Sequence, residues 1–111
     1  MVHLSTLAND QSTYIVTATF TDAAAAAVTP DSVVWSLTDA AGTVINSRTA
    51  VSATPGSSVA IVLSDADLDY SDGAIRILTV YAVYDSTEGD NLPLREEAYF
   101  GITNLNNVAA V

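Results

Sequence analysis

The chain has 111 residues, half of them hydrophobic, and contains no cysteine. This length is common for one domain with its own hydrophobic core, and we expect a single domain over residues 1–111 that folds without metal or disulfide. The absence of thiols excludes disulfide scaffolds, thiol catalysis and zinc–thiolate sites.

The charge is strongly negative, with 13 acidic residues against three arginines and a formal net charge of −10. Proteins bind nucleic acids and anionic lipids chiefly through lysine and arginine, so this balance argues against both as partners. The first 11 residues show no basic segment followed by an apolar run, and no stretch is apolar enough to span a bilayer. We therefore expect a soluble protein made in the cytoplasm, with extended or mobile termini at residues 1–11 and 104–111.

Hydrophobic residues recur with a period of two in one segment after another, which predicts strands. The expected strands are residues 12–20, 32–38, 43–49, 58–63, 74–84 and 94–102. Residues 43–49 show the weakest alternation, which is typical of an edge strand. Residues 74–84 are apolar on both faces, which indicates a strand that is central in its sheet or contacts another subunit. The side chains expected to face the core include Tyr14, Val16, Ala18, Phe20, Val33, Trp35, Leu37, Val59, Ile61, Leu63, Phe100 and Ile102.

The connections are predicted to be irregular. The alanines at residues 23–27 have high helix propensity, but the run is too short for a stable helix and Pro30 follows it, so we expect a loop or a single turn. Residues 64–73 form an acidic, irregular segment that Leu68 anchors to the core, and residues 85–93 form a polar loop.

The order of these segments, with Trp35 on the second long strand and an acidic turn before the long strand, resembles immunoglobulin-like domains. The resemblance is to the group without disulfides, because the cysteine pair of antibody domains is missing. It implies an all-β fold: an immunoglobulin-like antiparallel β-sandwich of about seven strands.

A narrower resemblance covers nearly the whole chain. It lies in residues 20–22, 29–39, 42, 63–68, 72–73, 78–80, 84, 92–96, 100 and 104–105. These segments resemble the small immunoglobulin-like virion proteins of tailed bacteriophages. The resemblance implies a capsid decoration or cement protein that binds the major capsid protein lattice or other virion proteins, as a symmetric homo-oligomer or in many copies per particle. The alternatives are a head–tail or tail accessory protein of the virion, and a bacterial surface module that binds carbohydrate or protein.

One segment suggests a metal site. The alternating carboxylates Asp65, Asp67, Asp69 and Asp72 would suit a calcium loop. The segment fails the EF-hand pattern, because Tyr70 stands where that loop needs glycine and Arg76 where it needs the bidentate glutamate. We favour a solvated acidic turn and expect no metal or other cofactor.

Catalytic patterns are missing as well. His3 is the sole histidine and lies in the terminal segment expected to be mobile, so we do not expect it to act as a positioned base. No Gly-x-Ser-x-Gly elbow is present, and the adjacent Glu96 and Glu97 would point to opposite faces of a strand. We therefore expect that the protein is not an enzyme.

The remaining functional candidates are contact residues. Trp35 is expected in the core, while one of Tyr81 and Tyr84, which have opposite parity, is expected at an interface. Apolar loop and tail positions, one tyrosine and one arginine are the candidates for contact with a partner: Ala25, Val28, Tyr84, Arg95, Val108 and Val111.

Overall fold

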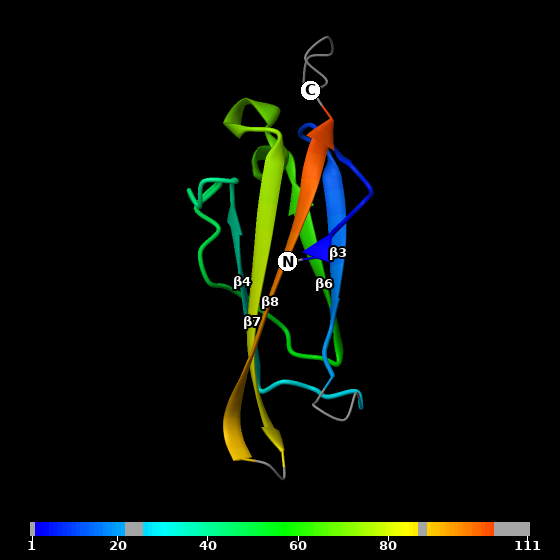
Figure 1. The fold of residues 1–111 in the computed structure, drawn as a ribbon, viewed down its shortest axis with the longest axis vertical. Coiled ribbons are helices and arrows are strands. Elements are labelled where there is room, and N and C mark those ends of the chain that lie inside the picture. Colours follow the sequence, from blue (N-terminus) through cyan, green and yellow to red (C-terminus); the bar gives the residue numbers. More distant parts are fainter. Residues whose placement is uncertain (1, 22–25, 87–88, 104–111) are drawn as a thin grey trace.

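The computed structural model describes residues 2–21, 26–86 and 89–103, and its fold is all-β, as the alternating pattern predicts (Figure 1). Its strands are β1 (Val2–His3), β2 (Ala8–Asn9), β3 (Thr13–Thr19), β4 (Ser32–Thr38), β5 (Val51–Ala53), β6 (Ser58–Ser64), β7 (Ile75–Ser86) and β8 (Gly89–Thr103). Two short 3-10 turns, η1 (Asp65–Leu68) and η2 (Tyr70–Asp72), lie between β6 and β7. No helix in this part of the chain is long and apolar enough to cross a bilayer.

The strands form two sheets that face each other in a sandwich-like arrangement (Figure 1). The larger sheet has the order β1-β8-β7-β4-β5, with β2 also paired to β8. In it, β1 and β2 run parallel to β8, and the other pairs are antiparallel. The smaller sheet consists of β3 and β6, antiparallel from Thr13↔Ser64 to Thr19↔Ser58. Membership of the immunoglobulin-like group stays a prediction.

The core lies between the sheets and contains the side chains predicted from the alternation. The fully or nearly buried members include Phe20, Val33, Trp35, Leu37, Val59, Ile61, Leu63, Leu68, Leu78, Val80, Ala82, Phe100 and Ile102. Tyr14, Val16 and Ala18 are partly buried and pack against this core. The strand β7 lies between β4 and β8, so its prediction as a central strand is confirmed.

The edge strand predicted at residues 43–49 is wrong. The strand that pairs with the outer side of β4 is the shorter β5, while residues 43–49 form a loop with a single bridge between Thr38 and Val44. Asn46, Ser47 and Ala50 have φ between 49° and 57°, in the left-handed region, and this breaks the extended conformation. The alternation was weak here because the loop buries one side chain, Ile45, rather than a row.

The polar loop predicted at residues 85–93 is shorter in the structure. β8 begins at Gly89, and Pro93 pairs with Val83 inside the β7–β8 ladder. Proline lacks an N–H donor and is tolerated on the side of a strand that needs none. In the described part of the chain, β1 and β2 pair only with residues 98–103 of β8, so the opposite edge beside Pro93 has no partner strand.

The N-terminal segment is extended, as expected, and it pairs with the large sheet, which the sequence pattern did not predict. β1 aligns Val2 and His3 with Ala98 and Tyr99, and the N–H of Leu4 donates to the carbonyl oxygen of Tyr99 at 2.9 Å. Pairs of two residues are too short to leave a periodic pattern, so β1 and β2 were not predicted. The C-terminal expectation for residues 104–111 lies outside the described residues.

Candidate protein-binding surface

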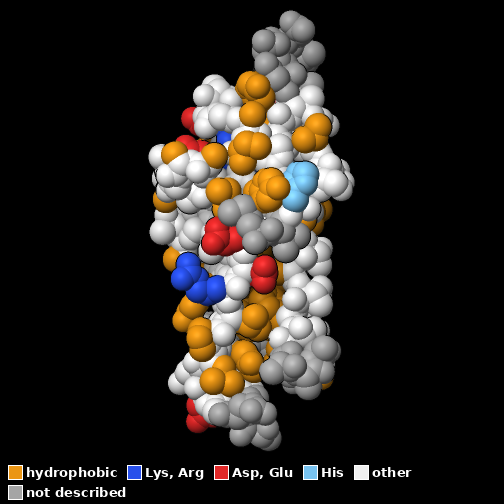
Figure 2. All heavy atoms as spheres, viewed as in Figure 1, with side chains coloured by type: hydrophobic (Ala, Val, Ile, Leu, Met, Phe, Trp, Pro, Cys, Tyr) orange, Lys and Arg blue, Asp and Glu red, His pale blue; other side chains and the backbone are white. Residues whose placement is uncertain are grey.

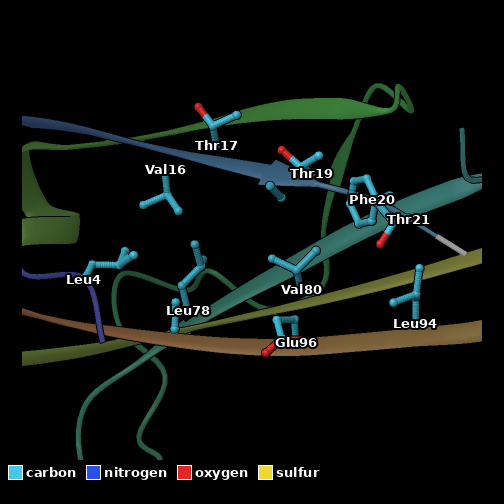
Figure 3. Close-up of a pocket in the computed structure, with 12 residues that line it drawn as sticks. Leu4, Val16, Thr17, Thr19, Phe20, Thr21, Leu78, Val80, Leu94 and Glu96 are labelled. Carbon is cyan, nitrogen blue, oxygen red and sulfur yellow. The ribbon is translucent and has the colours of Figure 1, made fainter. Parts of the chain in front are cut away.

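An apolar cleft of about 280 Å³ opens between the two sheets. One wall is formed by Val16 and Ala18 of β3 and by Phe20, which follows β3. The other wall is formed by Leu78 and Val80 of β7 and Leu94 of β8. In Figure 3, the side chains of Val16 and Val80 point into the space between the walls, whereas Thr17 and Thr19 point away from it. Glu96 on β8 is the charged residue among the described lining residues, so the cleft offers apolar contact with one acidic group.

A second hollow, of about 430 Å³, continues along the same side of β3. Residues 3–6 and 14–17 line it, and Leu4, Val16 and Thr17 line both hollows. The hydroxyl of Tyr14 donates to the carbonyl oxygen of Thr6 at 2.7 Å and holds the N-terminal segment beside β3. An open groove therefore follows β3 over most of its length.

The outer face of the small sheet is exposed and uncharged. Ile15 and Val62 are direct cross-strand neighbours and are 60% and 53% exposed. Neither β3 nor β6 contains a charged residue, although the chain carries a net charge of −10. Adjacent exposed apolar residues are characteristic of contact surfaces. Elsewhere, Figure 2 shows hydrophobic side chains along much of the visible face, interrupted by a few charged groups.

The contact residues predicted from the sequence do not gather at this groove. Val28 is half-buried against the core, and Tyr84 is half-buried on β7 opposite Leu92. Arg95 is exposed on β8, opposite the 40% exposed Tyr81. The other three predicted contact residues lie outside the described part of the chain: Ala25, Val108 and Val111.

The acidic segment does not assemble a cation site from its carboxylates. Asp67 is fully buried and turns towards Arg48, while Asp69 accepts hydrogen bonds from the N–H and the hydroxyl of Ser71, at 3.0 and 2.7 Å. Asp65 and Asp72 are exposed. Within the described ranges, no group of three or more histidine, aspartate or glutamate side chains is arranged to hold a metal ion. Leu68 is buried, so its predicted role as the anchor of this segment is confirmed.

The geometry of Asp67 explains its ionisation. Burial raises the pKa of its carboxyl, but hydrogen bonds from Arg48, Asn46 and the backbone N–H of Ser64 outweigh this effect, and the net shift is downwards. Asn46 Nδ2 lies 2.9 Å from Oδ1, and the Ser64 nitrogen 3.1 Å from Oδ2. In turn, the carboxylate raises the pKa of the Arg48 guanidinium. The Asp67 carboxylate therefore stabilises the fold, and both of its oxygens accept hydrogen bonds from other groups of the protein.

Arg76 is a structural residue that the sequence analysis did not identify as such. Its side chain is fully buried, and its donors reach four carbonyl oxygens of the acidic segment and the start of β7. Nε donates to the backbone carbonyl oxygen of Asp67 at 2.9 Å, and Nη1 donates to the carbonyl oxygens of Gly73 and Ile75 at 2.9 and 3.1 Å. The sequence does contain a signal for this role, because position 76 shares the inward parity of Leu78 and Val80.

The ring of His3 stacks on that of Tyr99, with centroids 4.6 Å apart. This contact helps to hold β1 against β8, so the sole histidine contributes to the packing of the large sheet.

Comparison with protein-family models, with curated proteins and with solved structures finds no match.

Proposed function

We propose that the chain is a non-enzymatic structural protein of a phage virion, most concretely a capsid decoration protein that binds the major capsid protein lattice. The observation that carries this proposal is the groove along β3, where an apolar cleft adjoins an exposed, uncharged sheet face. Such a surface suits contact with protein, and the resemblance of the chain to small virion proteins of tailed phages supplies the setting.

The environments of the chemically capable groups support a binding role over catalysis. His3 stacks on Tyr99, the carboxylate of Asp67 is bound by Arg48, and the guanidinium of Arg76 is bound by backbone carbonyl groups. Each of these groups serves the fold. The remaining acidic surface, with the net charge of −10, disfavours nucleic acid and anionic lipid as partners.

A small domain with one modest contact surface gains binding strength when many copies engage a symmetric lattice. The contacts of each copy need only be weak, because repetition on the particle provides avidity. A decoration protein works in this way, and the 111-residue chain is large enough for one such contact surface.

The test is mass spectrometry of purified, intact particles, together with binding of the purified protein to particles that lack it. We expect peptides of this chain in the particles and saturable binding to the empty lattice sites. Two matched variants extend the particle-binding measurement. Val16→Asp in the cleft wall should reduce binding to the particles, whereas Asp65→Asn, at an exposed position in the acidic segment, should not. Particles without these peptides, and no binding to the capsid, would refute the proposal.

A further inference from the structure

The free edge of β3 offers unpaired main-chain groups. The carbonyl oxygen of Ser12 accepts from the N–H of Asp65, and the N–H of Phe20 donates to Ser57, so the even-numbered residues of this segment bond towards β6. In an antiparallel ladder the alternate residues direct their N–H and C=O groups to the other side. These are Thr13, Ile15, Thr17 and Thr19, and no strand in the described part of the chain lies beyond them.

This edge lacks the features that prevent unwanted strand pairing at the edges of the large sheet. β5 has only three residues, and the unpaired part of β8 contains Pro93 together with the charged Arg95, Glu96 and Glu97. In contrast, β3 offers seven residues without proline, charge or bulge. Sheet edges that must remain single are normally shortened, charged or interrupted. The small sheet also has only two strands, an arrangement that gains stability from a third.

The charge of the chain favours a second copy of itself as the occupant. Two molecules that each carry −10 repel each other, and they approach most easily where neither presents a carboxylate. The β3 edge is such a place. Because this edge has no carboxylates, it also offers no electrostatic attraction to a basic peptide.

The hydrogen-bonding phase of β3 suits pairing with itself. In an antiparallel pair about a two-fold axis at Val16, Ile15 of one copy faces Thr17 of the other, and both direct their backbone groups to the shared edge. All seven residues of β3 then pair, with the exposed faces on the same side of the sheet. Val16, which lines both hollows, meets its own equivalent at the centre.

We propose that β3 pairs antiparallel with β3 of a second copy, so that the two-stranded sheets of two molecules join into one continuous four-stranded sheet. The interface is isologous, as expected for a closed dimer. The inference goes beyond the proposed function and does not rest on it, since pairing in solution requires no virion.

Sedimentation velocity of the purified full chain, from micromolar to near-millimolar concentration, tests this proposal. We expect a reversible monomer–dimer equilibrium that tightens when salt is raised, because salt screens the repulsion between acidic copies. A monomer at every concentration would overturn the proposal. So would a dimer that weakens with salt, because that response indicates an interface held by opposite charges.

Two matched variants locate the interface. Thr17→Glu and Ala60→Glu add the same charge to cross-strand neighbours on the exposed face, but only the first is at the seam. We expect Thr17→Glu to weaken the dimer by about tenfold or more, and Ala60→Glu to change it by less than about threefold. Circular dichroism checks that both variants fold. Equal effects from the two substitutions would contradict an interface at β3.

A double variant tests the register of the two β3 strands by restoring association rather than by weakening it. In the proposed pairing, Ile15→Lys combined with Thr17→Glu places each introduced lysine opposite the introduced glutamate of the other copy. We expect the double variant to recover most of the association that Thr17→Glu loses. Failure of this recovery in a folded double variant would contradict the register centred on Val16.

Discussion

The Nε atom of Arg48 donates a 2.8 Å hydrogen bond to Oδ1 of Asp67, and this ion pair ties the loop after β4 to the acidic segment after β6. Asp67 is fully buried, whereas the side chain of Arg48 is 37% exposed and lies over the ring of Trp35, with 5.8 Å from Cζ to the ring centroid. One buried carboxylate therefore organises two connections that contain no strand.

Replacing this carboxylate should destabilise the fold. Asp67→Ala removes the acceptor for Arg48, Asn46 and the partly buried backbone N–H of Ser64, and we expect a loss of about 2–4 kcal/mol in the free energy of unfolding. The measurement is urea denaturation. The exposed Asp65→Asn is the control and should stay within about 0.5 kcal/mol of the native protein, because asparagine tolerates the left-handed φ of 53° at this position. Equal stability of the two variants would show that the pair contributes little.

The same carboxylate should make stability depend on acid. Its folded pKa lies below the unfolded value of about 3.9, so its contribution is complete above the unfolded pKa and is lost as the pH falls through the folded pKa. Asp67→Asn cannot titrate at this position. We therefore expect the stability difference between the native protein and Asp67→Asn to shrink on acidification from about pH 5 to about pH 2.

The pKa of Asp31 moves in the opposite direction, raised by a hydrogen bond with Asp85 and by the charge of that group. Its protonation favours the folded state as the pH falls. This effect is the same in the native protein and in Asp67→Asn, so it cancels in the stability difference between them. A difference that stays constant down to about pH 2 would contradict the assignment of a lowered pKa to Asp67.

Arg76 should be needed for the order of the acidic segment. Arg76→Met leaves four carbonyl oxygens without their donor, and we expect a loss of about 3–5 kcal/mol and faster amide exchange at Leu68. Arg76→Lys should recover little, because an ammonium group cannot reproduce the planar set of donors. The exposed Arg95→Met is the control and should be nearly neutral. Full stability of Arg76→Lys would show that charge alone is sufficient.

Calcium should not stabilise the protein. Asp67 is committed to Arg48, and Asp69 to Ser71, so the acidic segment lacks free converging ligands. We expect the melting temperature to be the same after treatment with chelator and after addition of millimolar calcium. A melting temperature that falls with chelator and recovers with calcium would establish the loop site that the alternating aspartates suggest.

Much of the fold could be predicted from the sequence because the alternation of apolar and polar residues reports directly on which face of each strand is buried. The inward rows of β4 and β6, such as Val33, Trp35 and Leu37, are as expected. The errors fall where this signal is weak. Left-handed residues broke the predicted strand at 43–49, and β1 was missed because pairing to a distant strand leaves no local pattern in two residues.

The candidate surface could be predicted less well. The tyrosine and the loop residues were predicted as contacts because residues of these types are common at interfaces. The groove beside β3 instead depends on which strands pair with each other, and the sequence pattern does not define that pairing. The partners of Asp67 and Arg76 are also non-local. Arg48 lies 19 residues from Asp67 in sequence, so neither composition nor periodicity links them.

Amide hydrogen exchange along β3, followed by NMR as a function of protein concentration, tests most directly whether this edge is left open for a second strand. At low concentration, the amides of Val16 and Ala18 should be protected by β6, while those of Ile15 and Thr17 exchange quickly. At high concentration, the amides of Ile15 and Thr17 should become protected as well. Exchange at these two positions that is equally fast at every concentration would contradict the account.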